Sequence, residues 1–110
     1  NKLGITEFND YIIYNFETNK VEIPFSETFK KFKIATPSQG LSETINNKEI
    51  LIEESDFGRL MIVDKNSKIL WQFHNKNEKG ESFLLTWSRY IERKSVGNVI
   101  EILVNSNCNK

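Results

Sequence analysis

Alternating apolar and polar positions predict that this chain is mainly β-structure built from hairpins. The first hairpin is expected over residues 11–25, where two alternating runs flank a turn at Thr18 and Asn19. Pro24 lacks a backbone donor, so the second of these strands should be an edge strand or end there. Between residues 41 and 75, four more apolar runs follow one another through short turns, which predicts an antiparallel β-meander.

The four strands of the predicted meander are separated by turns rich in Asn, Asp and Ser. They are expected at residues 41–45, 50–54, 60–63 and 69–74. The third strand is apolar on both faces, as is typical of a strand covered on two sides. In the fourth strand Ile69, Trp71 and Phe73 recur at every second position, so we expect them to share one face and that face to be core.

Three further segments flank the meander. Residues 82–91 alternate like a closing strand. Residues 26–33 carry phenylalanines at helical spacing with lysines between them, which predicts a short amphipathic helix near 26–33. Apolar residues at 95–104 also have helical spacing, with Ser95 as an N-cap, and this favours a C-terminal helix; the β-branched VIEILV run leaves a strand open as the alternative, and Gly97 weakens the helix.

The length and a faint repeat shape the expected domain organisation. The chain of 110 residues has room for one core and is treated as a single domain, 1–110, with a tail at 95–110. Residues 12–25 resemble residues 60–73, at a spacing in the range of about 40 to 50 residues that is typical of β-propeller blades. On this interpretation 41–75 is one complete four-stranded blade and 11–25 is the outer hairpin of the blade before it.

The composition argues against several classes of function. Fifteen Lys and Arg balance fifteen Asp and Glu, so the basic excess of nucleic-acid-binding proteins is missing. No apolar run approaches the about 18 residues of a membrane-spanning helix. The single cysteine, Cys108, excludes an intrachain disulfide and a cysteine-based zinc site, and no phosphate-binding loop is present. We therefore predict a soluble chain without cofactor or metal, and the composition assigns no compartment.

The densest charged cluster is a candidate anion-binding site. Glu53, Glu54, Asp56 and Arg59 lie within seven positions, and Arg89 is expected to approach them from the closing strand. An arginine pair held by carboxylates would bind an oxyanion; the alternative is an ion-pair network that fixes the strand register. Neighbouring glutamates on a strand point to opposite faces, so Glu53 and Glu54 are not expected to act as an acid/base pair.

Two tryptophans form a candidate aromatic platform. Trp71 and Trp87 carry flat rings that would stack on a sugar or an aryl group, but both occupy positions in phase with the predicted core, which favours packing. His74, the only histidine, ends the outermost strand and is expected to be a solvent-facing edge residue.

The motifs of the second half of the chain resemble the arylsulfotransferase-like β-propeller family, in particular the C-terminal blade of uncharacterised bacterial members. The resemblance covers residues 11–91 and includes the run 37–41 (PSQGL). Its further motif residues are Glu53, Glu54, Ser55, Gly58, Arg59, Asp64, Lys65, Lys68, Ile69, Trp71, Phe73, Trp87, Ser88 and Arg89. Ser67 departs from it, since the family turn usually has glycine there.

The resemblance implies a propeller fold, an extracytoplasmic or periplasmic location, and sulfuryl transfer by histidines in the central channel. The innermost strand of this chain instead begins Gly40-Leu41-Ser42-Glu43, without histidine. The resemblance therefore implies a scaffold role without a catalytic site of its own, with the remaining blades or other copies of the chain as partners. The alternatives are a small module that binds a protein or a glycan, and a sulfotransferase-type enzyme acting on a sulfate or aryl ligand.

Overall fold

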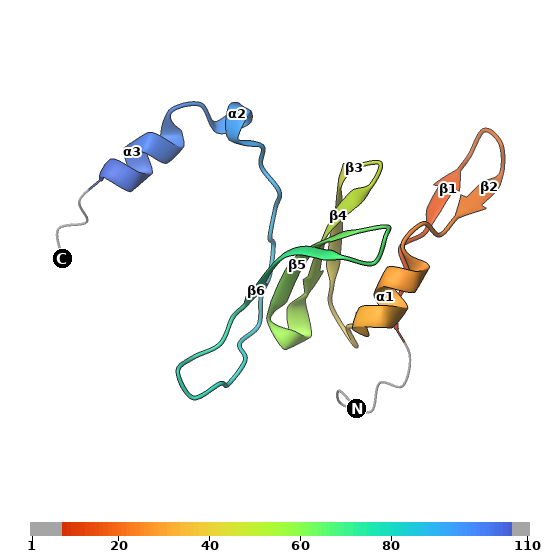
Figure 1. Ribbon diagram of the computed structural model, residues 1–110, viewed down its shortest axis with the longest axis horizontal. Helices are drawn as coiled ribbons and strands as arrows, with labels where there is room; N and C mark the ends of the chain where they lie inside the picture. The colour runs from red at the N-terminus through yellow and green to blue at the C-terminus, as the bar shows by residue number, and fades with distance from the viewer. Residues whose placement is uncertain (1–7, 107–110) are drawn as a thin grey trace.

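The structure is a computed structural model that describes residues 8–106, with a four-stranded antiparallel sheet at its centre (Figure 1). The strands are β3 (Leu41–Asn46), β4 (Glu49–Glu54), β5 (Arg59–Asp64) and β6 (Ile69–His74), in the order β3-β4-β5-β6. Each strand pairs with the next along the chain, so the sheet is a meander. The prediction of a mainly β meander is confirmed.

The predicted N-terminal hairpin forms a separate two-stranded sheet. Its strands are β1 (Ile13–Asn15) and β2 (Lys20–Glu22). Asn19 has φ of 53°, the left-handed conformation that asparagine tolerates better than most residues. The side chain of Asn15 accepts hydrogen bonds from the backbone of Glu17 and Thr18 at 3.0 and 2.9 Å, which fixes the turn.

The helix predicted near 26–33 is present as α1 (Ser26–Phe32) and covers one face of the sheet, the first face. Buried apolar side chains from the helix and its flanks pack on the sheet. The cluster consists of Phe25, Phe29, Ile34, Ile50, Ile52, Met61 and Val63. This contact is the core of the described chain.

The C-terminus of α1 closes in a Schellman arrangement. Ile34 N–H donates to the Phe29 carbonyl oxygen at 2.9 Å and Lys33 N–H donates to the Lys30 carbonyl oxygen at 3.2 Å. Ile34 and Phe29 also meet in the core, which is the apolar contact that accompanies this motif. Lys33 occupies the left-handed position, with φ of 50° and ψ of 49°.

Replacing Lys33 with glycine is expected to stabilise the protein by up to about 1 kcal/mol, because a left-handed conformation costs a residue with a Cβ roughly 1–2 kcal/mol and glycine little. Urea denaturation followed by circular dichroism measures the change. Lys30→Gly, inside the same helix, is the control and should destabilise by about 1 kcal/mol. Equal losses in both variants would contradict the assigned cap.

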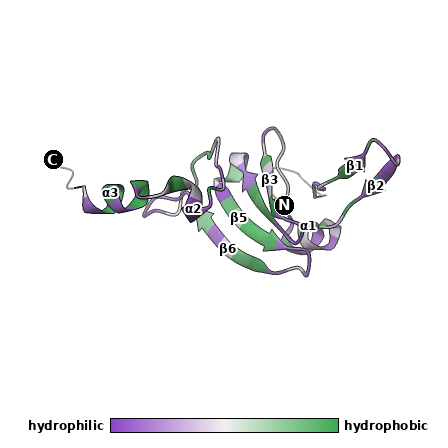
Figure 2. Ribbon diagram, turned by 90° about the horizontal axis from the view of Figure 1, so that it is seen from above, coloured by the Kyte–Doolittle hydropathy of each residue, from purple (hydrophilic) through white to green (hydrophobic). Residues whose placement is uncertain are grey.

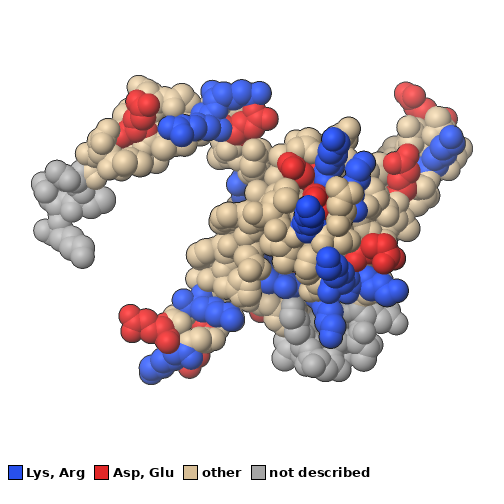
Figure 3. Space-filling view, viewed as in Figure 1, with Lys and Arg blue, Asp and Glu red and all other residues tan. Residues whose placement is uncertain are grey.

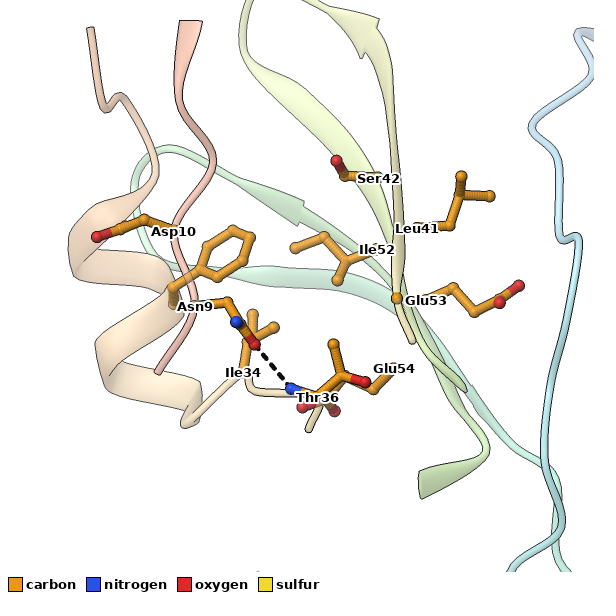
Figure 4. A pocket seen from close by; sticks show the side chains of 11 residues that line it. Asn9, Asp10, Ile34, Thr36, Leu41, Ser42, Ile52, Glu53 and Glu54 are labelled. Atoms are coloured by element: carbon orange, nitrogen blue, oxygen red, sulfur yellow. Dashed lines mark hydrogen bonds between the residues drawn. The ribbon is translucent and has the colours of Figure 1, made fainter. Parts of the chain in front are cut away.

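The opposite face of the sheet is called the second face. Strand pairing identifies its members, since paired residues share a face: Glu53 pairs with Leu41 and Leu60, and Ile62 pairs with Leu51 and Trp71. Phe73 pairs with Leu60 and also belongs to it. In Figure 4 Leu41 and Glu53 point away from α1, whereas Ile52 points toward it.

The prediction that Ile69 shares a buried face with Trp71 and Phe73 is wrong. A register shift between Ile62 and Val63 pairs Ile69 with Val63, so Ile69 packs against the core of the first face. Trp71 and Phe73 lie on the second face and are 48% and 45% exposed. Helices α2 and α3 lie away from β6, and α1 is on the first face (Figure 1).

The closing strand expected at 82–91 is also absent. Only an isolated bridge between Lys76 and Ser82 is present, and the following residues form no ladder. The Ser88 and Tyr90 N–H groups donate instead to the side chains of Glu53 and Glu43, at 2.8 and 3.1 Å. Since both glutamates lie on the second face, residues 83–91 cross that face rather than extend an edge. We call them the crossing segment.

The C-terminal residues are helical, which confirms the favoured alternative over a strand. They form α2 (Arg93–Val96) and α3 (Val99–Asn105), separated at Gly97 with φ of 51°. Ser95 lies inside α2, so its predicted role as N-cap is wrong, and Asn98 precedes α3. The end of the predicted tail, with Cys108, lies outside the described residues.

The molecule is elongated. Helices α2 and α3 project on one side of the sheet and the β1–β2 hairpin projects on the other (Figures 1 and 2). The radius of gyration is 16.6 Å, against about 13 Å for a compact domain of this length. Much apolar surface is therefore left uncovered, including most of α3.

Candidate functional site

The charged cluster predicted from the sequence surrounds the corner between β4 and β5. A short 3-10 turn, η1 (Ser55–Phe57), joins the two strands and ends at Gly58, which has φ of 61°. Alternation along β4 sends Glu53 and Glu54 to opposite faces of the sheet, as predicted. Each acidic residue of the cluster therefore contacts a different segment of the chain.

Glu54 and Arg59 form a buried ion pair beneath α1. Glu54 is fully buried and accepts a hydrogen bond from Ala35 N–H at 2.7 Å and another from Arg59 Nε. Arg59 also donates to the carbonyl oxygen of Phe32, at 3.4 Å. These contacts connect the end of α1 with β4 and β5. The guanidinium of Arg59 therefore has a structural role between the helix and the sheet.

Asp56 anchors the loop that leads into β3. Its carboxylate accepts hydrogen bonds from the Ser38 hydroxyl at 2.6 Å, the Thr36 hydroxyl at 2.5 Å, and the backbone N–H groups of Ser38 and Gln39 at 3.0 and 3.2 Å. Hydrogen bonds from Ser38 and Thr36 lower the pKa of Asp56 well below its usual range. The sequence placed Asp56 in the charged cluster but gave no sign of this loop contact.

Replacing Asp56 with asparagine is expected to destabilise the protein at neutral pH. Because the folded-state pKa of Asp56 is lowered, the carboxylate contributes stability above its unfolded pKa of about 3.9, and this contribution is lost as the pH falls below that value. The difference between wild type and D56N should therefore be largest near neutral pH and shrink in acid. Thermal melts of both proteins across this pH range measure it, and a difference that grows in acid would contradict the contact.

Glu53 lies on the second face, under the crossing segment. It is 3% exposed, and its two carboxylate oxygens accept hydrogen bonds from the Ser55 hydroxyl at 2.7 Å and from Ser88 N–H at 2.8 Å. Burial acts to raise the pKa of Glu53, but the hydrogen bonds from Ser88 and Ser55 together with the charge of Arg89 outweigh it and lower the pKa. Glu53 is therefore an ionised carboxylate inside the structure.

The two predicted arginines have different contacts. Arg59 contacts Glu54 on the first face, whereas the Arg89 guanidinium donates to the Ser88 carbonyl oxygen at 3.2 Å and lies over the Trp87 ring at 6.0 Å. None of their described hydrogen bonds joins the two arginines to a common group. The predicted arginine pair is thus divided between two sites.

The two tryptophans are not packed in the core, contrary to the alternative that their positions favoured. Trp87 is 83% exposed, and its φ of 64° is exceptional for a bulky side chain. The left-handed backbone at Trp87 interrupts the extended conformation. The alternation of faces predicted for residues 82–91 therefore does not continue past it. Trp71 lies on β6 and does not line the hollow beside Trp87.

Glu53 and Trp87 line one open hollow of about 430 Å³. Its other walls are the loop 38–41, Ser55 and Thr86. The structure therefore brings together one predicted anion-site residue and one predicted platform residue, and it adds Gln39 and Thr86, which no sequence pattern singled out. We call this the Trp87 hollow.

A second cavity of about 190 Å³ lies between α1 and the sheet (Figure 4). Polar side chains around it bond within the protein: Asn9 Oδ1 accepts from Thr36 N–H at 2.7 Å, and Asp10 accepts from the Ser26 hydroxyl at 3.4 Å. This cavity is therefore part of the packing between the helix and the sheet.

Charged side chains of both signs intermingle on the face shown in Figure 3. His74 is exposed at the end of β6, where it was expected. Within residues 8–106, no three His, Cys, Asp or Glu side chains are grouped to hold a metal ion. The described helices also include none long and apolar enough to cross a membrane.

No protein-family model matches the sequence, and no curated protein or solved structure is significantly similar to it.

Proposed function

We propose that this chain is a scaffold blade of a β-propeller of the arylsulfotransferase-like kind and has no catalytic site of its own. Its partners are further blades or other copies of the chain, which cover the exposed part of the second face around Trp71 and Phe73. Propellers close with roughly four to eight blades, so a single four-stranded blade has to be joined by others.

The observation that carries the proposal is the apolar surface left open on the second face. Trp71 and Phe73 are about half exposed next to the half-buried Leu60 and Ile62. A contiguous patch of this kind indicates an interaction surface. The first face, in contrast, is covered by α1 and Phe25.

The edges of the sheet support the same function. β3 and β6 each pair with only one strand among those described, as the innermost and outermost strands of a four-stranded blade do. The elongated shape, with a radius of gyration of 16.6 Å, also fits a unit that completes its core with neighbours.

Substitution of the second face tests the proposal. The variant Trp71→Ser/Phe73→Ser is expected to lower the self-association of the purified chain, measured as weight-average mass by sedimentation equilibrium over a concentration series. Lys65→Ser/Lys68→Ser, in the exposed turn before β6, is the matched control and should associate like wild type. Equal masses for all three proteins would contradict the proposal.

A ligand-binding module is the second candidate function. The Trp87 hollow favours it, because an exposed aromatic ring and a buried carboxylate line one space of a size typical of small-molecule sites, about 300–1,000 Å³.

A further inference from the structure

The walls of the Trp87 hollow come from parts of the chain that lie far apart in the sequence. Three separate segments supply its walls: the loop 38–41, the end of β4 with η1, and the crossing segment. Asp56 holds the loop by four hydrogen bonds, and Glu53 holds the crossing segment at Ser88. Hydrogen bonds to the sheet therefore position two of the three walls.

Trp87 is presented to solvent at an energetic cost. A bulky residue with φ of 64° is strained, and exposure of an indole ring loses the stabilisation that burial would provide. Strained backbone of this kind is concentrated at functional sites. Nothing in the fold requires a tryptophan here, since the ring makes no buried contact in the core cluster.

Glu53 brings unused acceptor capacity to the hollow. A carboxylate has about four acceptor sites, and the Ser55 hydroxyl, the Ser88 N–H and the Ser88 side chain use three of those of Glu53. A ligand hydroxyl that reaches the carboxylate would donate to the remaining site. The Gln39 carboxamide and the Thr86 hydroxyl, on the other walls, both donate and accept.

We infer that the Trp87 hollow binds a neutral carbohydrate, with one pyranose ring against the indole of Trp87 and its hydroxyls toward Glu53, Gln39 and Thr86. A pyranose has an apolar C–H face that stacks on an aromatic ring and a rim of hydroxyl donors. The inference does not depend on the propeller proposal.

The charges of the site disfavour the other ligand classes. The ionised Glu53 repels an anion, and a purely apolar ligand would offer no donor to its remaining acceptor site. A cation would compete with Arg89, whose guanidinium already lies over the Trp87 ring and whose charge acts on Glu53. A neutral donor of hydrogen bonds avoids both conflicts.

Titration of the full chain with neutral methyl glycosides of glucose, galactose and N-acetylglucosamine tests the inference. Trp71 and Trp87 are the only tryptophans, so each gives one indole N–H signal in a proton–nitrogen NMR spectrum. At least one glycoside is expected to shift the Trp87 signal saturably, with a Kd on the order of 1 mM for a ligand of this size, and to leave the Trp71 signal in place.

Two variants distinguish binding in the Trp87 hollow from binding to other exposed aromatic side chains. Trp87→Gly relieves the backbone strain, should keep the fold, and is expected to weaken binding at least tenfold; because its Trp87 indole signal is lost, binding is read in all variants from the backbone amide signals of Gln39 and Thr86. Trp71→Phe is the matched control and should bind within twofold of wild type. The absence of a saturable shift with any of the glycosides, equal shifts at both tryptophans, or unchanged affinity in W87G would overturn the inference; none of these results would alter the mass measurements that test the scaffold proposal.

Discussion

Gly58→Ala is expected to destabilise the protein by about 3 kcal/mol, a large effect for a single added methyl group, because two costs add. Gly58 has φ of 61°, which is strained for alanine, and an added Cβ would overlap the carbonyl group of Phe83. That carbonyl belongs to backbone, so it yields only if the start of the crossing segment moves. The backbone of Asn75 is hydrogen-bonded to both residues of this contact. Its N–H donates to the Gly58 carbonyl oxygen at 2.8 Å, and its carbonyl oxygen accepts from Phe83 N–H at 2.8 Å.

Urea denaturation of G58A measures this loss, and Gly80→Ala is its control. Gly80 has φ of 81° but nothing within 4 Å of the added Cβ, so only the conformational cost of about 1–2 kcal/mol applies. The difference between the two variants isolates the contact with the crossing segment. Equal losses would show that residues 83–91 do not lie against this corner of the sheet.

Glu54→Ala is expected to cost about 3–5 kcal/mol, because it leaves a mostly buried Arg59 guanidinium without its carboxylate. It also removes the acceptor of Ala35 N–H at the end of α1. Thermal and urea melts measure the loss. Glu78→Ala, in an exposed turn, should change stability by less than about 0.5 kcal/mol.

The double variant Glu54→Leu/Arg59→Met distinguishes a broken charge pair from lost packing. Replacing both members of a buried ion pair by apolar groups is often nearly neutral, so the double variant should recover most of the stability lost in E54A. A double variant as unstable as E54A would contradict the ion-pair explanation.

The strands of the central sheet were predictable because alternation and turn residues agree along this part of the chain. The runs at 41–45, 50–54, 60–63 and 69–74 each correspond to a strand, and Asn19 takes the left-handed conformation for which its side chain is suited. The helix α1 was predictable for the same reason, since its phenylalanine spacing matches the face that packs on the sheet.

The predictions were wrong where one local feature changes which face of the sheet the following side chains lie on. The register shift opposite Ile62 moves Ile69 to the first face while Trp71 stays on the second. The left-handed backbone at Trp87 likewise ends the alternation predicted for 82–91. Neither feature has a sequence signal such as a glycine, so alternation alone assigned both tryptophans to the core.

Several residues of the candidate site could be predicted from the sequence, but which of them lie together could not. Glu53, Trp87 and Arg89 were predicted as candidate site residues, but no sequence pattern indicated that Glu53 and Trp87 lie at the same site. Their meeting depends on the hydrogen bond from Ser88 N–H to Glu53 across the second face. Gln39 was missed because its position depends on the contact between its loop and Asp56.

We propose that the second face is open for neighbours around Trp71 and Phe73. The solution mass of the 110-residue chain, measured by light scattering on a sizing column together with a thermal melt, tests this proposal. We expect self-association above the monomer mass of 12.9 kDa, or a melt without a cooperative transition. A cooperative melt at the monomer mass would contradict it.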